Sequence, residues 1–125
     1  GIASIRLLAP TTPRARVERV LADARGYLYC VSFAGVTGAD ALDPAAAGTR
    51  IAALRERSPV PVLAGFGIKD AASAAGMAER ADGVVVGSAL VAALAVATDP
   101  VRAAGDFLAP LRAALDAAGP AQPLR

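Results

Sequence analysis

Two short glycine-bearing turns contain the residues whose types and spacing suit the binding of an anionic ligand. They are Gly65-Phe66-Gly67-Ile68 and Gly83-Val84-Val85-Val86-Gly87-Ser88. Each lies at the carboxyl end of an apolar, β-branched run, and each leads into a stretch with helical periodicity. Glycine lets the backbone approach a ligand closely, and the helix that follows directs unpaired N–H groups and the positive end of its dipole at that ligand. Two such turns on successive strands predict a binding site for one phosphate group.

Each of these features also has a purely structural interpretation. The pair Gly65 and Gly67 is compatible with a simple strand-to-helix turn, because two glycines alone are a weak motif. Ser88 suits the N-cap of a helix, although one hydroxyl can both cap a helix and hold a phosphate. Tyr27 and Tyr29 share one face of a strand, where packing alone would explain them. The second glycine turn favours the phosphate interpretation.

Groups for proton transfer are scarce near these turns. The sequence has no histidine, which excludes a histidine-based triad and a histidine-ligated metal within this chain. The nearest acids are Asp40, Asp43 and Asp70, and none of them lies at an expected strand end. General acid–base catalysis needs such a group within hydrogen-bond reach of the substrate. The residues therefore offer phosphate binding and tyrosine hydroxyls, and we expect neither a metal nor a cofactor.

Predicted strands and helices, which must position these turns, alternate along the chain. Apolar runs predict strands over residues 2–8, 27–31, 60–64 and 83–86. Cap residues and prolines predict helix starts at Thr11-Thr12-Pro13, Asp43-Pro44, Asp70, Ser88 and Asp99-Pro100. Breaks are expected at Gly26, Gly48, Pro110 and Gly119. The expected buried helix faces are Val17, Val20, Leu21 and Ala24, then Ile51 and Leu54, then Ala74, Met77 and Ala78, then Leu108, Leu111 and Leu115.

The composition fits one domain and excludes several classes of partner. The chain has 125 residues, of which 55% are hydrophobic and 19% charged, with a net charge of +2. No apolar run approaches the length of a membrane span, and scattered arginines with few aromatics argue against nucleic acid. The one cysteine, Cys30, excludes an internal disulfide and suits the role of a small buried hydrophobe. A single cysteine and the lack of a signal pattern lead us to expect a cytoplasmic protein.

Strand and helix alternate four times, which predicts an α/β fold with a parallel sheet and right-handed crossovers. A (β/α)8 barrel needs about 250 residues. We therefore predict a single (β/α)4 half of a TIM barrel over residues 1–125, with residues 120–125 as a frayed tail. Such a half leaves two open edges and an uncovered inner face. We expect the chain to pair with its missing half, to dimerise face to face, or to repack.

Several strings of residues resemble the tryptophan synthase alpha chain family. They are Gly26-Tyr27-Leu28-Tyr29-Cys30-Val31-Ser32, Gly35-Val36-Thr37-Gly38-Ala39, Gly65-Phe66-Gly67-Ile68 and residues 81–90. The resemblance extends from Ile5 to about Leu115, and the first two strings are its most specific part. It implies a (β/α)8 barrel that cleaves indole-3-glycerol phosphate to indole and glyceraldehyde 3-phosphate. It also implies a partner, the beta chain, which receives the indole.

The resemblance assigns roles to particular residues. This chain would be strands five to eight of the barrel. The substrate phosphate would be held by Gly38, Phe66, Gly67, Gly87 and Ser88. Tyr29 would face the active site, and Thr37 would lie in a loop that closes over the substrate. The two catalytic carboxylates of the family belong to the first half of the barrel, so we expect the intact protein to be a lyase and this chain alone to be inactive.

Two other functions remain open. One is a non-catalytic phosphate-binding or interaction module that retains affinity for the beta chain. The other is a different phosphate-binding barrel enzyme, such as an isomerase of histidine or tryptophan synthesis. The Gly35-Val36-Thr37-Gly38 loop argues against the latter.

Overall fold

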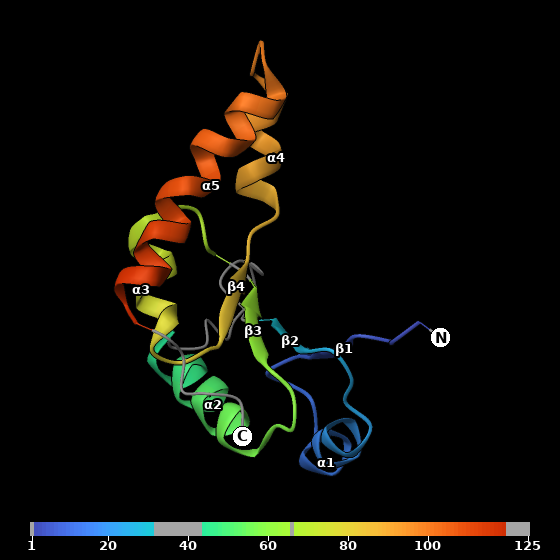
Figure 1. Ribbon diagram of the computed structural model, residues 1–125. Helices are drawn as coiled ribbons and strands as arrows, with labels where there is room; N and C mark the ends of the chain where they lie inside the picture. The colour runs from blue at the N-terminus through green and yellow to red at the C-terminus, as the bar shows by residue number, and fades with distance from the viewer. Residues whose placement is uncertain (1, 32–43, 66, 120–125) are drawn as a thin grey trace.

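Four parallel strands form one sheet in the computed structural model, which describes residues 2–31, 44–65 and 67–119. The strand order is β1-β2-β3-β4, and strands alternate with helices along the chain (Figure 1). The strands are β1 (Arg6–Leu8), β2 (Leu28–Val31), β3 (Val62–Gly65) and β4 (Gly83–Val85). The helices are α1 (Arg14–Ala22), α2 (Pro44–Arg57), α3 (Ala71–Ala78), α4 (Ser88–Ala95) and α5 (Pro100–Ala117). This sequential parallel arrangement confirms the predicted α/β fold class.

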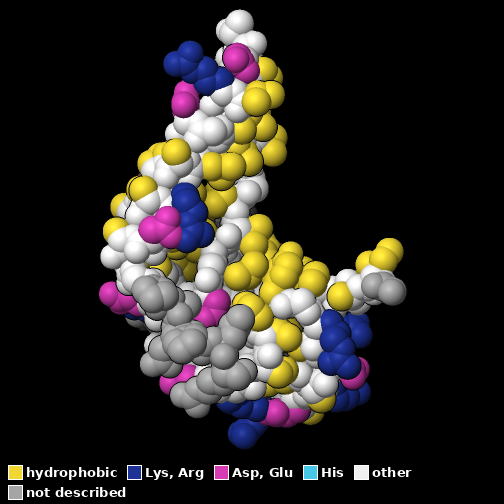
Figure 2. Space-filling model, viewed as in Figure 1, with side chains coloured by type: hydrophobic (Ala, Val, Ile, Leu, Met, Phe, Trp, Pro, Cys, Tyr) yellow, Lys and Arg dark blue, Asp and Glu magenta, His cyan; other side chains and the backbone are white. Residues whose placement is uncertain are grey.

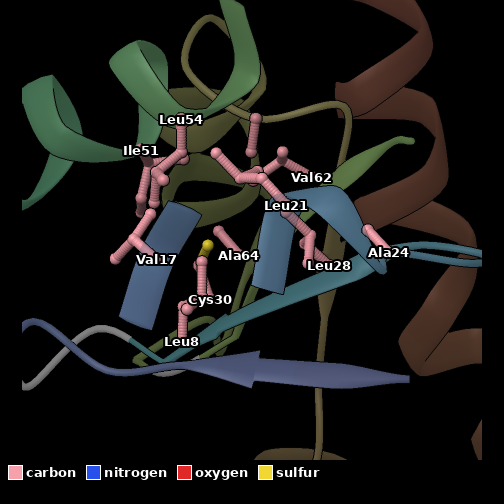
Figure 3. Packing of buried hydrophobic residues seen from close by; sticks show 11 residues of the cluster. Leu8, Val17, Leu21, Ala24, Leu28, Cys30, Ile51, Leu54, Val62 and Ala64 are labelled. Atoms are coloured by element: carbon pink, nitrogen blue, oxygen red, sulfur yellow. The ribbon is translucent and has the colours of Figure 1, made fainter. Parts of the chain in front are cut away.

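One face of the sheet is buried beneath helices. Leu28 and Val62 are fully buried, and the strand register places Cys30 between Leu8 and Ala64. Figure 3 shows these side chains pointing toward α1 and α2. The helix residues that meet them are Val17, Leu21, Ile51 and Leu54. The expected buried faces of the first two helices are thus confirmed, apart from Val20, which is half-buried.

The opposite face of the sheet is open within the described part of the chain. Side chains alternate between the two faces of a strand, so this face carries Leu7, Tyr29 and Leu63, which are neighbours in the register. Leu7 is 62% exposed. Figure 2 shows hydrophobic side chains gathered in the hollow between α4 and the sheet. A closed barrel would bury this face in its interior.

Helices α3 and α5 form a second, smaller core against β4. Its buried members are Ile68, Ala74 and Leu111. Helix α4 packs beside α5, and the two extend beyond the sheet as an arm (Figure 1). No residue of α4 is buried, and Val91 is 65% exposed. None of the helices in the described residues combines the length and apolarity needed to cross a membrane.

The predicted helix caps Asp70 and Asp99 are confirmed, whereas the predicted cap of the first helix is wrong and Ser88 follows the N-cap Gly87. Asp70 accepts a hydrogen bond from the Ser73 N–H at 2.8 Å, and Asp99 accepts one from the Arg102 N–H at 3.0 Å. Pro13 occupies the N-cap of α1, which has no side-chain cap. The Thr12 hydroxyl instead accepts from the Ala9 N–H at 2.9 Å, so it stabilises the turn that precedes the helix.

Several strands and helices differ in length from those that the sequence predicts. All four strands are shorter than predicted, because pairing with a neighbour, and not apolarity, sets their ends. Helix α2 continues through Gly48, and α5 continues through Pro110 as one helix. Leu108 is 43% exposed, so the expected buried face of α5 is correct only for Leu111 and, in part, Leu115. The loop over residues 33–42 and the tail over 120–125 lie outside the described residues.

A largely buried ion pair joins α2 to the sheet at the amino ends of the strands. Arg55 Nε donates to Asp82 Oδ1 at 2.8 Å, and the other carboxylate oxygen accepts from the Val62 N–H at 2.8 Å. The side chains of Arg55 and Asp82 are 20% and 14% exposed. Asp82 therefore holds the start of β3, the start of β4 and α2 together.

Candidate functional site

A cleft lies where β3 and β4 lead into the following helices. Its volume is about 360 Å³. The lining residues come from β2, β4, the turn after β3 and the start of α4: Tyr29, Gly67, Ile68, Lys69, Val85, Gly87, Ser88 and Ala89. The carboxyl ends of parallel strands are where ligands bind in α/β folds. Both glycine turns singled out in the sequence contribute to this one cleft.

The amino end of α4 is open toward the cleft. Gly87 is the N-cap and has no side chain to cap the helix, and the first N–H to bond back along the helix is that of Val91, which donates to the Gly87 carbonyl at 3.0 Å. The first N–H groups of any helix have no partner within it. Ser88 is exposed and is the first helical residue, and no side chain caps α4, so the Ser88 hydroxyl can serve a ligand. These groups suit an anion.

The amino end of α3 is closed, which corrects the expectation that both turns present a free helix terminus. The Asp70 carboxylate accepts from the Ser73 N–H, and the Ser73 hydroxyl accepts from the Asp70 N–H at 3.1 Å. The same hydroxyl accepts from the Lys69 N–H at 3.1 Å. The Asp70 carboxylate thus already supplies a negative charge at this terminus, which makes the terminus a weaker site for an external anion.

Gly65 makes room for Tyr29 and does not itself line the cleft. It is buried, and a Cβ at this position would overlap the phenol ring of Tyr29, hydroxyl oxygen included. Val31 pairs with Gly65 in the register, two residues beyond Tyr29. The glycine therefore lets the tyrosine ring lie flat across β3 toward the cleft. Sequence reasoning took Gly65 as a point of close approach to a ligand, and the structure shows close approach to an aromatic side chain.

Gly67 has a backbone that favours glycine. Its φ is +70°, in the left-handed region where a Cβ is strained. The turn it makes brings the chain from β3 to Ile68, which is buried against Ala74 and Leu111. Gly87 differs, because its φ is −118° and a Cβ there would meet none of the described atoms within 4 Å. Open space at position 87 is therefore available to a ligand.

Lys69 is the charged residue among those that line the cleft, and sequence reasoning missed it. It is exposed, and it is the one lysine of the sequence. A lysine ammonium is a point charge on a flexible stem, which suits contact with a phosphate. Its place directly after the Gly65-Phe66-Gly67-Ile68 turn was the signal that could have identified it.

Four of the seven predicted site residues lie together in this cleft: Tyr29, Gly67, Gly87 and Ser88. Thr37, Gly38 and Phe66 lie outside the described residues. No aspartate or glutamate lines the cleft within the described part of the chain. Within residues 2–31, 44–65 and 67–119 there is also no group of three or more acids and cysteines placed to hold a metal ion.

Cys30 takes no part in this cleft. It is 3% exposed, and burial raises the pKa of its thiol to about 11. A thiol that stays protonated at neutral pH is a poor nucleophile. The expectation that Cys30 is a small buried hydrophobe is confirmed.

Four sequential parallel βα units with a cleft at their carboxyl end define the class of this protein as half of a TIM (β/α)8 barrel. The sequence model described as "Tryptophan synthase alpha chain" matches residues 1–114. The chain belongs to the tryptophan synthase alpha chain family.

Individual relatives agree with this assignment. The chain is 63% identical over 121 residues to the tryptophan synthase alpha chain of Xanthomonas campestris pv. campestris (strain B100), which covers 94% of this chain and 44% of the relative. It is 60% identical over 120 residues to that of Xylella fastidiosa (strain 9a5c), covering 94% and 45%. The chain therefore spans less than half the length of the curated relatives it matches.

Solved structures give the same result. The crystal structure of the tryptophan synthase alpha chain from Legionella pneumophila subsp. pneumophila superposes with a TM-score of 0.78 at 37% identity. The superposition covers 94% of this chain and 44% of that one. A tryptophan synthase structure from M. tuberculosis in an aminoacrylate-bound form gives a TM-score of 0.72 at 30% identity, covering 91% and 40%.

Proposed function

We propose that this chain is the phosphate-holding half of a lyase that cleaves indole-3-glycerol phosphate to indole and glyceraldehyde 3-phosphate. The observation that supports this most is the cleft in which the open amino end of α4, the left-handed turn at Gly67 and the Lys69 ammonium lie together. Helix N–H groups, a hydroxyl and a cation are the groups that recognise a phosphate. Membership of the alpha chain family supports the choice of substrate.

Each residue has a role in this proposal. The N–H groups at the start of α4 and the Ser88 hydroxyl donate to phosphate oxygens, and Lys69 compensates their charge. Gly67 and Gly87 keep side chains away from the phosphate. Tyr29 lines the path toward the rest of the substrate. Thr37, Gly38 and Phe66 are proposed from the family resemblance alone, with Gly38 and Phe66 at the phosphate and Thr37 in a loop over the substrate.

The proton chemistry is assigned to another part of the intact enzyme. Carbon–carbon cleavage of this substrate needs a general acid and base, and no carboxylate lines the cleft in the part of the chain that the structure describes. The family resemblance implies two catalytic carboxylates in the first half of the barrel, a glutamate on strand two and an aspartate in the following loop, with this chain supplying strands five to eight. The chain alone binds the phosphate end and turns over no substrate.

The partners follow from the same proposal. The substrate is a small phosphorylated indole compound, and the beta chain of tryptophan synthase receives the indole that is released. As an enzyme of tryptophan biosynthesis, the intact protein is proposed to be cytoplasmic. The open inner face of the sheet, where Leu7 is 62% exposed, supports self-association of this chain when the other half of the barrel is not there.

Substitution of Lys69 tests the phosphate site. The titration of the wild-type chain with glycerol 3-phosphate, followed by calorimetry, should give a dissociation constant of about 1 mM. Lys69→Met removes the cation and keeps most of the side-chain length. The dissociation constant should therefore rise about tenfold, which corresponds to a loss of about 1.4 kcal/mol of binding free energy. Arg102→Met at the far end of the arm removes an equal charge and is the matched control. Equal affinities of wild type and Lys69→Met would contradict the assigned role.

An assay of indole release tests the reaction. The chain is mixed with the first half of the Xanthomonas campestris relative, and indole-3-glycerol phosphate is added. We expect indole only from the mixture and none from either half alone. Indole from the purified chain alone would contradict the assignment of the catalytic carboxylates to the first half. If the mixture binds phosphate and releases no indole, a non-catalytic phosphate-binding module is favoured.

A further inference from the structure

Arg50 of α2 binds the turn that follows β1. Nη1 of its guanidinium donates to the Pro10 carbonyl, and Nη2 donates to the Thr12 carbonyl at 3.0 Å. A planar guanidinium can hold two acceptors at once, and its charge strengthens each hydrogen bond. Arg50 therefore connects α2 with the turn between β1 and α1.

Hydrogen bonds within this turn give it a defined shape. The Thr12 N–H donates to the Ala9 carbonyl at 2.9 Å, and the Ala9 N–H donates to the Thr12 hydroxyl at 2.9 Å. Neither of these bonds uses the Pro10 or the Thr12 carbonyl, and Arg50 is a donor that both carbonyls share. Thr12 thus shapes the turn, and Arg50 fixes the turn to the neighbouring helix.

Arg57 makes a comparable contact further along the same helix. It follows Arg50 by about two helical turns, so both arginines lie on one face of α2. It donates to the Glu18 carboxylate of α1 at 2.6 Å, and both arginines are exposed. Arg57 binds a side chain within α1, whereas Arg50 binds backbone at the carboxyl end of β1. In a sheet of parallel strands this end lies at the edge where the cleft opens.

The turn that Arg50 holds lies on the side of the cleft away from the phosphate-binding groups. Gly67 and Ser88 follow β3 and β4, whereas the turn follows β1. Tyr29 lies on β2, between them in the strand order β1-β2-β3-β4, and it lines the cleft. A ligand whose phosphate lies at the amino end of α4 therefore extends past Tyr29 toward this turn.

We propose that Arg50 is a positioning residue, which holds the turn after β1 in place for the part of the ligand that lies beyond the phosphate. Arg50 itself touches no ligand, because its donors are engaged by the Pro10 and Thr12 carbonyls. The identity of the ligand rests on the proposed function, whereas the hold of Arg50 on the turn does not. Removal of Arg50 should therefore loosen the turn and leave the phosphate-binding groups unchanged.

Hydrogen exchange of single amides, followed by NMR, tests the hold on the turn. In Arg50→Met the N–H groups of Ala9 and Thr12 should exchange at least about fivefold faster, because two hydrogen bonds that fix the turn are lost. The Leu28 N–H at the amino end of β2 reports on general loss of stability and should not change. Arg57→Met, the matched control, should leave all three rates unchanged. Unchanged rates at Ala9 and Thr12 in Arg50→Met, or an equal rise at Leu28, would overturn the proposal.

Calorimetric titration with two ligands tests the effect of the turn on binding. Glycerol 3-phosphate lacks the indole, and indole-3-glycerol phosphate carries it. We expect Arg50→Met to leave the dissociation constant of glycerol 3-phosphate unchanged and to raise that of indole-3-glycerol phosphate about threefold, because a loosened turn must be ordered when the indole binds. Arg57→Met should change neither constant.

The two ligands also separate this proposal from the proposed function. Unchanged affinity of Arg50→Met for indole-3-glycerol phosphate, or an equal loss for both ligands, would overturn the positioning role. A wild-type chain that binds neither ligand would contradict the proposed function and the ligand role of the turn together. Faster exchange at Ala9 and Thr12 in Arg50→Met would still show in that case that Arg50 holds the turn.

Discussion

Single residues in the cleft show that glycine serves two purposes there. Gly67 makes a left-handed turn with a φ of +70°, whereas Gly65 leaves the space that the Tyr29 ring fills. The same short string, Gly65-Phe66-Gly67, thus shapes the backbone at one position and admits an aromatic side chain at the other. Tyr29 can reach the cleft because Gly65 has no side chain in the space that the tyrosine ring occupies.

The contact between Gly65 and Tyr29 gives a direct prediction. Gly65→Ala should lower the free energy of unfolding by about 1–3 kcal/mol, because the new methyl group and the ring cannot share one place. Urea unfolding followed by circular dichroism measures the loss. In a Tyr29→Ser background the same change should cost much less, since the ring is gone. Equal losses in the two backgrounds would show that the ring does not occupy this space.

At the scale of elements, the two helices that follow the glycine turns have opposite roles. α3 is closed by its own capping box of Asp70 and Ser73, so its terminus serves stability. α4 begins at Gly87 without a cap, and its terminus is free to serve a ligand. Helix-start patterns in the sequence identify both helices, but whether a terminus is open depends on where the Asp70 and Ser88 side chains point.

The α3 cap predicts a pH dependence. Hydrogen bonds from the backbone and then the side chain of Ser73 lower the pKa of Asp70 below its ordinary value of 3.8. The stabilisation is therefore complete above that value and is lost as the pH falls through the lowered pKa of the folded protein. Asp70→Ala should destabilise the chain at pH 7 and show a smaller difference from the wild type at pH 2. Urea unfolding at both pH values measures this, and a difference that does not change with pH would refute it.

At the scale of the whole molecule, the sequence predicts the order of four βα units, because apolar runs and cap residues are local signals. It also predicts that Gly67, Gly87 and Ser88 lie together, because parallel strands end at one edge. Lys69 was not identified, although it directly follows the Gly65-Phe66-Gly67-Ile68 turn, because a lone lysine next to an aspartate is also typical of a solvated surface. Nor does the sequence separate Leu108 from Leu111, because burial on α5 depends on which neighbours are present.

The Arg55–Asp82 pair connects α2 with β3 and β4. Arg55→Met should lower the free energy of unfolding by about 1–3 kcal/mol, because it leaves a largely buried carboxylate short of a donor. Arg57→Met is the matched control: its ion pair with Glu18 is nearly half exposed and should be worth less than about 1 kcal/mol. Thermal unfolding of both variants measures the two losses of stability. Equal losses would show that Asp82 does not connect these elements more strongly than an exposed ion pair does.

The measurement that tests the phosphate cleft most directly is a titration of the ¹⁵N-labelled chain with inorganic phosphate, followed by two-dimensional NMR. We predict that the amide signals of Gly87, Ser88 and Ala89 move in a saturable way, together with Gly67 and Lys69. The amides of Ala72 and Ser73 in the first turn of α3 should stay in place, because Asp70 already occupies that terminus. Signals that move at α3 and not at α4, or no movement at either helix, would contradict the account.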